Sequence, residues 1–475
     1  MNAGDTAWVL VSAALVLLMS PGLAIFYGGM TRVKSMLNMM MMSFGALALV
    51  GVLWVLFGYS IAFGTDAGDG LFGNPLEDFG LHNLLATGSS MPLVGTIPEI
   101  VFVGFQGVIA TVTVALVSGA IADRAKFGSW MVFAGAFAVL VYFPVAHWVF
   151  DSKKDAHGTF IGGWLNHLGL IDFAGGTAVE VLAGAAGLAL ALVLGKRVGF
   201  GKDPEHRPHN LPLVMLGCGL LWFGWFGFNA GSALAANGEA GFAWINTLVA
   251  PCAAILSWLV VEKVRDGHAT SFGAASGAVA GLVAITPSCA TIDPAWAIVL
   301  GILAGAVCAL AVGLKYRFGY DDSLDVVGVH LVGGIIGTLF IGLAADPAAP
   351  VPGRGLFYGG GLALLGTQAL GTGAVLGYSF IVALGLGLAI KAVMGFRVAR
   401  DVEETGVDLV IHAETAYSSP SATGGGFHPL GVRHTVETLL EQHLERRLGQ
   451  AAADGAHGQR EEVLAGASPT GTVGS

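Results

Sequence analysis

The chain contains 475 residues, of which 55% are hydrophobic and 11% charged, with a mean hydropathy of +0.74. Soluble proteins carry about 25% charged residues, so this composition excludes an ordinary soluble domain and indicates a polytopic membrane protein. The formal net charge of −10 argues against nucleic acid as a partner. The four cysteines are scattered and form no CxxC pair, so the sequence predicts neither a disulfide framework nor a metal site, and no cofactor.

Apolar runs of about 20 residues recur along the chain and favour transmembrane helices over a β-barrel, whose strands alternate in polarity. The 73 glycines lie largely inside these runs, which predicts closely packed helices. Eleven spans are expected, at about residues 7–29, 37–63, 98–121, 127–150, 173–195, 211–232, 240–261, 271–287, 295–315, 327–345 and 365–394. The predicted fold is therefore all-α, with eleven transmembrane helices.

The loops between these spans differ in basic residues, which are enriched in loops on the cytoplasmic side of a membrane. Alternate assignment gives three basic residues to one set of loops, Lys153, Lys154 and Arg354. It gives twelve to the other set, Arg32, Lys34, Arg124, Lys126, Lys196, Arg197, Lys202, Arg207, Lys263, Arg265, Lys315 and Arg317. The leader before the first span has no basic residue, unlike a cleavable signal. We expect the N-terminus outside and the C-terminus in the cytoplasm.

Two apolar segments share an unusual pattern, an aspartate followed eight residues later by an ionisable side chain. Asp172 precedes Glu180, and Asp322 precedes His330. Eight residues of helix rise about 12 Å in a bilayer core of roughly 30 Å, so Glu180 and His330 are expected near mid-depth and in contact. Helix capping explains the aspartates, whereas ionisable residues within a span usually mark an ion or proton pathway. The odd number of spans between the two copies predicts a 5+5 inverted repeat followed by a final helix.

Four motifs together resemble the ammonium transporter family, which includes the Amt, Mep and Rh proteins. They are Pro21 to Gly29, Asp172 to Thr177, Gly224 to Ser232 and Asp321 to Gly334, and the resemblance covers roughly residues 5–417. It implies eleven helices, a homotrimer and one hydrophobic pore per subunit. It also implies an ammonium or methylammonium substrate and a multi-pass protein of the plasma (inner) membrane, a transporter and not an enzyme.

The resemblance also implies roles for individual residues. Phe228 matches a phenylalanine that restricts the pore, and Ser232 matches the hydroxyl of an outer site that recruits ammonium. His330 matches the second of two facing pore histidines, and Asp172 matches an acidic residue that supports the outer site through the backbone. Three further residues are expected to support the pore, although an aromatic ring at helical spacing usually only packs: Trp225, Asp322 and Asp325.

Three positions depart from the family pattern. Glu180 stands where most members carry the first pore histidine, although some branches have a carboxylate there. Phe105 matches a family phenylalanine of the pore gate, but Ile109 replaces the restricting one. Phe150 replaces the tryptophan of the outer site, with Trp164 as an alternative for that role, because the loop between them makes the alignment ambiguous.

The chain divides into a transmembrane domain (1–395), a region that resembles the family's cytoplasmic regulatory segment (396–417) and an extended tail (418–475). The regulatory segment implies coupling between subunits and a PII-type signalling protein as a partner at the cytoplasmic face. In the tail, residues 432–449 carry an amphipathic stripe, and the remainder reads as disordered.

The sequence thus predicts a transporter that recruits ammonium, deprotonates it and conducts ammonia, with the proton passing separately through Glu180 and His330. Two alternatives stay open. One is an ammonium sensor that signals through the tail, and the other is a passive ammonia channel.

Overall fold

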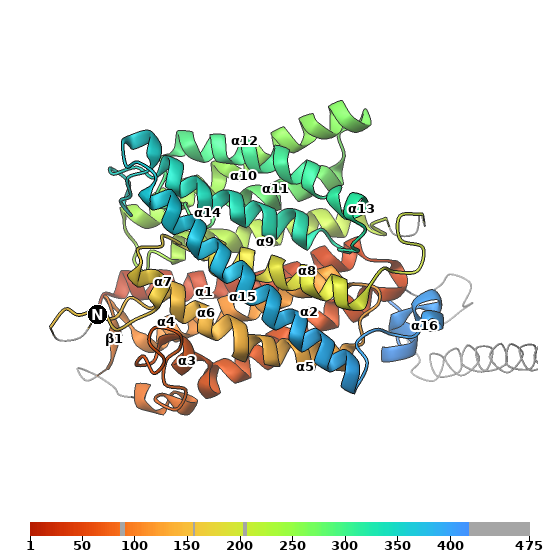
Figure 1. Cartoon of the computed structure of the whole chain (residues 1–475), viewed down its shortest axis with the longest axis horizontal. Coiled ribbons are helices and arrows are strands. Elements are labelled where there is room, and N and C mark those ends of the chain that lie inside the picture. The colour runs from red at the N-terminus through yellow and green to blue at the C-terminus, as the bar shows by residue number, and fades with distance from the viewer. Residues whose placement is uncertain (86–90, 155–156, 203–206, 418–475) are drawn as a thin grey trace, which may run out of the picture.

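The computed structural model describes residues 1–85, 91–154, 157–202 and 207–417. The predicted amphipathic helix at 432–449 lies outside these residues. The described chain is a bundle of long helices that run roughly along one common direction (Figure 1). We call the end that holds the N-terminus and β1 the outer end, and the end that holds α13 and α16 the inner end, following the orientation that the charge distribution predicts.

Twelve helices form the bundle in the described part of the chain: α1 (Ala3–Met30), α2 (Met36–Leu53), α4 (Glu99–Val117), α5 (Phe127–Phe137), α6 (Phe143–Phe150), α8 (Leu182–Leu194), α9 (Leu211–Gly231), α10 (Gly238–Asp266), α11 (Ser271–Ile285), α12 (Pro294–Ala311), α14 (Val332–Ala344) and α15 (Ala363–Val393). Shorter α-helices and two paired antiparallel strands occupy the ends: α3 (Tyr59–Phe63), α7 (Trp164–His167), α13 (Leu314–Phe318), α16 (Arg400–Thr405), β1 (Leu93–Val94) and β2 (Ile97–Pro98).

Short turns of other helical types complete the architecture. Wider π-helical turns join α2 to α3, join α5 to α6, precede α8, precede α14 and follow α16: Trp54–Gly58, Ala138–Tyr142, Gly176–Val181, Val327–Leu331 and Asp408–His412. Tighter 3₁₀ turns lie at Val33–Ser35, Phe79–Leu84, Ser118–Ile121 and Leu356–Tyr358. Such π turns inside membrane helices often lie at functional sites, and two of them carry Glu180 and His330.

The helices coincide with the predicted spans. Among the described residues, ten helical stretches are long and apolar enough to cross a membrane, which confirms a mostly helical polytopic membrane protein. The span expected at 271–287 is α11, which has 15 residues and is almost completely buried. At 1.5 Å per residue it is shorter than a bilayer core.

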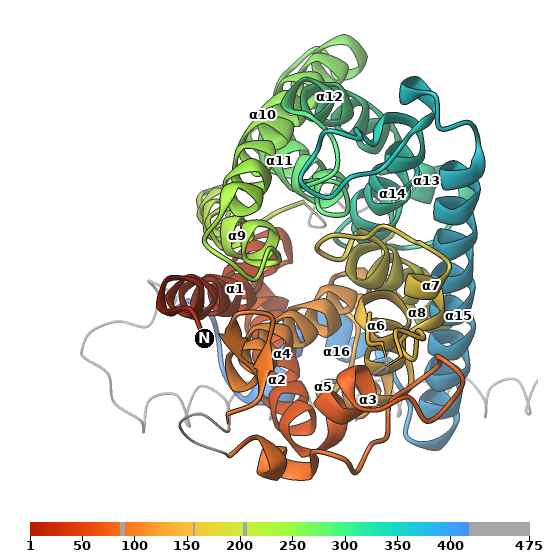
Figure 2. The same ribbon diagram turned by 90° about the vertical axis from the view of Figure 1, so that its left-hand side faces the viewer.

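Glycines allow the helices to approach closely, as predicted. Helix α1 packs along α9, where a Cβ atom added at Gly217 would lie 2.4 Å from the backbone nitrogen of Phe26. A Cβ atom at Gly224 would lie 2.3 Å from Cγ of Met19. Figure 2 shows α1 to α6 grouped on one side and α9 to α14 on the other, with α15 running along both groups.

The residues that follow α15 fold back onto the inner end. The carboxylate of Asp408 accepts the backbone N–H groups of Leu37 and Asn38 at 2.8 and 2.7 Å, and so caps the N-terminus of α2. Glu403 is fully buried and accepts the N–H of Val198 at 2.6 Å. The segment predicted to be regulatory is thus docked on the ends of two membrane helices.

Candidate functional site

Asp172 organises the start of the α8 segment. One carboxylate oxygen accepts the N–H groups of Gly175 and Gly176 at 2.9 and 2.7 Å, and the other accepts those of Thr177 and Ala178 at 2.8 and 3.0 Å. These are the N–H groups that have no partner within the helix. Asp172 therefore caps this segment, as predicted.

Asp322 organises the α14 segment in the same way, accepting the N–H groups of Val326 and Val327 at 3.1 and 2.7 Å. Three residues after each capping aspartate the backbone is left-handed, with φ +118° at Gly175 and φ +63° at Asp325. Unlike glycine, Asp325 adopts this conformation with a side chain, which forms an ion pair with Lys315 at 2.6 Å. The two segments therefore share local structure as well as the spacing of eight residues.

The two segments enter the bundle from opposite ends. Asp172 lines a cavity at the outer end. The loop that holds Asp321 and Asp322 lies instead beside Arg197, just beyond the other end of α8: Arg197 donates to Asp321 through its backbone N–H and its guanidinium, at 2.7 to 2.9 Å. The guanidinium of Arg124 donates to the Asp321 carbonyl and to Ser323. Burial opposes ionisation of Asp321, but the charges of Arg124 and Arg197 outweigh it and lower the pKa of this carboxyl to about 2.

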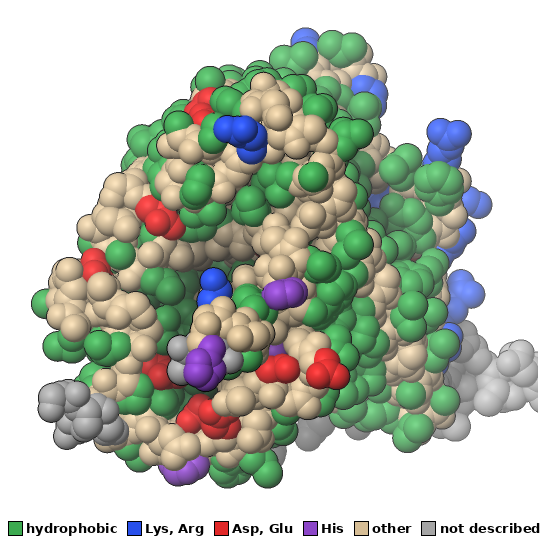
Figure 3. Space-filling model, turned by 60° about the vertical axis from the view of Figure 1, so that its left-hand side comes forward, with side chains coloured by type: hydrophobic (Ala, Val, Ile, Leu, Met, Phe, Trp, Pro, Cys, Tyr) green, Lys and Arg blue, Asp and Glu red, His purple; other side chains and the backbone are tan. Residues whose placement is uncertain are grey.

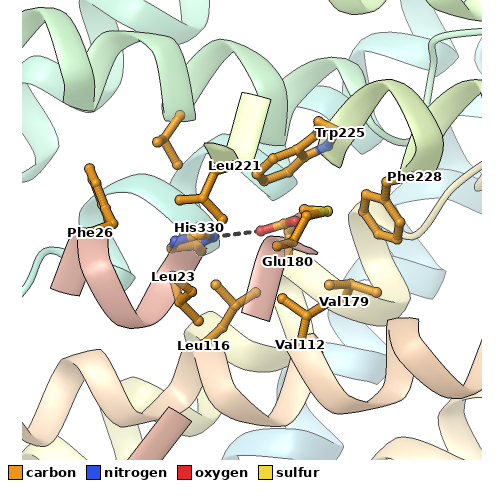
Figure 4. Close-up of a pocket in the computed structure, with 12 residues that line it drawn as sticks. Leu23, Phe26, Val112, Leu116, Val179, Glu180, Leu221, Trp225, Phe228 and His330 are labelled. Atoms are coloured by element: carbon orange, nitrogen blue, oxygen red, sulfur yellow. Dashed lines mark hydrogen bonds and ion pairs between the residues drawn. The ribbon is translucent and has the colours of Figure 1, made fainter. Parts of the chain in front are cut away.

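Glu180 and His330 meet between the two segments. Oε2 of Glu180 lies 2.6 Å from Nδ1 of His330, and the two residues are only 1% and 4% exposed (Figure 4). Oε1 of Glu180 is buried and has no hydrogen-bond partner among the described residues. An unpaired buried carboxylate oxygen is costly, so this atom is available to accept a proton or an N–H group.

A small apolar cavity surrounds the pair. Its free space is about 10 Å³, close to what one water-sized molecule needs. Apart from the pair, the lining is apolar: Met19, Leu23, Phe26, Val112, Leu116, Val179, Leu221, Trp225, Phe228 and Val279. The indole N–H of Trp225 donates to the Thr286 hydroxyl at 2.8 Å, and its ring meets Phe228 edge to face at 5.9 Å. Trp225, predicted only as a supporting residue, is thus part of this lining.

A larger cavity of about 300 Å³ lies at the outer end. Figure 3 shows a hollow on this side of the molecule, with acidic side chains around it. The lining combines aromatic, aliphatic and a few polar groups: Phe63, Phe102, Gln106, Ile109, Val149, Phe150, Asn166, Leu170, Ile171, Asp172, Phe173, Ala174, Ser232, Leu234 and Val351. Helix α4 contributes to the lining of both cavities: Gln106 and Ile109 line the outer one and Val112 lines the inner one.

A model of the Ammonium Transporter Family matches residues 7–417. The chain belongs to this family. The ammonium transporter of Mycobacterium tuberculosis (strain ATCC 25618 / H37Rv) is 55% identical over 468 residues, covering 94% of this chain and 96% of the relative. The ammonium transporter of Bacillus subtilis (strain 168) is 43% identical over 420 residues, covering 88% of this chain and 99% of the relative.

Solved structures of the family agree with the fold. Saccharomyces cerevisiae Mep2 matches with a TM-score of 0.76 at 35% identity, over 84% of this chain and 88% of that one. A structure described as a sensor Amt protein matches with a TM-score of 0.77 at 28% identity, over 86% of this chain and 97% of that one.

Among the residues predicted from the family resemblance, the structure separates those that line a cavity from those that do not. Phe150, Ser232 and Ile109 line the outer cavity, and Phe228 lines the inner one. Phe105 is fully buried and lines neither. Trp164 also lines neither, and its ring instead packs against Trp148, 5.6 Å between centroids.

Sequence reasoning missed two polar residues of the outer cavity, Gln106 and Asn166. Gln106 lies between Phe105 and Ile109, the two positions that the family resemblance singles out there. Asn166 lies in the short helix α7, just after a loop whose alignment to the family is ambiguous, and a single asparagine gives no signal of its own.

Proposed function

We propose that this member of the family transports ammonium across the plasma (inner) membrane as a homotrimer with its N-terminus outside. Ammonium or methylammonium enters the outer cavity, loses a proton near Phe228, and crosses as the neutral amine through the path that Ile109 and Phe228 restrict. The proton travels separately by way of Glu180 and His330.

The apolar lining of the inner cavity supports crossing in the neutral form. Transfer of a permanent charge into an apolar environment is strongly unfavourable unless the charge is paired. Past Ile109, the inner lining offers ionisable groups at only two positions among the described residues, Glu180 and His330. A neutral amine avoids this cost, and its size suits the small inner cavity.

The observation that carries the proposed proton path is the buried hydrogen bond between Glu180 and His330. A carboxylate and an imidazole at 2.6 Å exchange a proton without leaving the apolar cavity, and the free Oε1 of Glu180 provides a second position for it.

Electrophysiology on the reconstituted protein tests this proposal. Ammonium-dependent current should be lost in both Glu180→Ala and His330→Ala, while His268→Ala, an exposed histidine outside both cavities, keeps it. Glu180→His should retain transport with an altered pH profile. Current that persists unchanged in both alanine variants would refute the proton path, and an unaltered profile in Glu180→His would count against a role for the carboxylate.

A second candidate function is ammonium sensing through the cytoplasmic region. It is supported by the likeness to a sensor Amt protein and by the docking of Glu403 and Asp408 on the ends of membrane helices. A PII-type protein at the inner face is the partner that the family resemblance implies. Uptake of labelled methylammonium by cells that express the protein separates the two functions, since tight binding without uptake indicates a sensor. Flux without current indicates passive conduction of neutral gas.

A further inference from the structure

Asn166 lies at the outer cavity with its amide held in one orientation. Its Nδ2 donates to the carbonyl of Val149 at 2.9 Å. Val149 is in the last turn of α6, where carbonyl groups lack partners within the helix. The opposite orientation of the amide would place two oxygens against each other, so the hydrogen bond determines which end of the amide faces Val149.

The carbonyl oxygen of Asn166 is therefore the free end of this amide. Within the described part of the chain no group donates a hydrogen bond to it, and the residue lines the cavity. Asn166 as a whole is half-buried. Gln106 also lines the cavity, but no described group holds its amide in place.

Of the other polar groups of the cavity, Ser232 keeps a free acceptor and Asp172 is already occupied. The carboxylate of Asp172 already accepts four backbone N–H groups. The hydroxyl of Ser232 donates to the Phe228 carbonyl at 2.8 Å, which leaves its lone pairs free. Among the hydrophobic positions, Ile109 offers no ring face, and the phenyl ring of Phe150 attracts cations less strongly than an indole ring.

We propose that Asn166 is a further substrate-binding residue of the outer cavity, where its carbonyl oxygen and the Ser232 hydroxyl each accept an N–H of ammonium. This inference rests on the proposed transport of ammonium. Ammonium that leaves water needs acceptors for its N–H groups, and an oriented amide oxygen supplies one that the rings of this cavity do not.

The test compares Asn166→Leu with His167→Leu, the adjacent position of α7, whose exposed ring packs on Phe160 and does not line the cavity. Asn166→Leu should raise KM for ammonium-dependent current about fivefold, the loss of roughly one hydrogen bond, with Vmax within about twofold of the wild type. The pH profile should stay that of the wild type, because Glu180 and His330 are not altered. His167→Leu should change neither KM nor Vmax.

Asn166→Ala provides a second variant that does not fill the cavity, and the same rise in KM is expected. An unchanged KM in either variant at wild-type Vmax would overturn the inference. Loss of Vmax in both variants, or a shifted pH profile, would assign Asn166 a structural role instead and would also overturn it. Absence of current in the wild-type protein would be a failure of the proposed transport function, which this comparison distinguishes from a failure of Asn166.

Discussion

Gly184 permits the contact between Glu180 and His330, and its replacement offers a direct test of that geometry. Gly184 lies on α8 one turn after Glu180, against the segment that carries His330. A Cβ atom added at Gly184 would lie 2.5 Å from the backbone nitrogen of Leu331 and 2.6 Å from its Cα. These are backbone atoms, so no side-chain rotation relieves the clash in Gly184→Ala.

The size of the effect follows from these distances. Restoring ordinary contact at 3.4 Å requires the two segments to separate by about 0.9 Å. The same displacement would lengthen the 2.6 Å bond between Glu180 and His330 to about 3.5 Å, the outer limit of a hydrogen bond. Overpacking costs about 1–3 kcal/mol, and leaving buried hydrogen-bonding groups without their partners costs about 1–3 kcal/mol.

Thermal unfolding of the purified protein and ammonium-dependent current after reconstitution measure the two consequences. Gly184→Ala should unfold at a lower temperature and lose most of its current. Gly373→Ala is the matched control, because Gly373 is an exposed position of α15 with no atom within 4 Å of the added Cβ. Alanine should stabilise the helix there by up to about 1 kcal/mol. A Gly184→Ala protein with wild-type current would show that the close contact of these segments is not required for transport.

Two predictions concern the inner end. The neighbouring arginines lower the pKa of Asp321 from 3.8 to about 2, so its carboxylate contributes about 2 kcal/mol of stability above its unfolded pKa, which is lost as pH falls through about 2. Asp321→Asn should therefore lower the unfolding temperature at neutral pH, and the difference from the wild type should become smaller as the pH is lowered. Asp266→Asn, in an exposed ion pair, should change the unfolding temperature little. The same lowering of the unfolding temperature by Asp321→Asn at all pH values would contradict this. Asp408→Ala removes the cap of α2 and should cost about 0.5–2 kcal/mol and speed proteolysis within 396–417, with Glu404→Ala, in an exposed pair, as the control. Unchanged proteolysis in Asp408→Ala would show that this carboxylate does not hold the segment.

The order and extent of the helices follow from the sequence with few corrections. Each expected span coincides with helical structure, because bilayer-length apolar runs and their capping residues are local properties of the chain. The sequence likewise predicts Asp172 and Asp322 as helix caps. Helix α11 departs most from the expected span, because it is shorter than a bilayer core. It is buried, so the surrounding helices cover it in place of lipid.

The sequence predicts only part of the candidate site. The equal spacing from Asp172 to Glu180 and from Asp322 to His330 placed the pair at similar depth, but depth alone does not make two side chains meet. The family resemblance left Phe150 and Trp164 as alternatives for the outer aromatic position. The structure places Phe150 in the outer cavity and Trp164 against Trp148.

What the sequence by itself determined about this protein is its class, its helices, its family and the two intramembrane ionisable residues, all of which depend on local composition and spacing. What only the tertiary structure decided is which side chains share a cavity. Glu180 reaches His330, 150 residues away, because Gly184 allows two backbones to approach. Asn166 faces the outer cavity because a carbonyl of α6 holds its amide. Such contacts depend on how segments far apart in the sequence pack together, and the local sequence of each segment does not encode the distance between them.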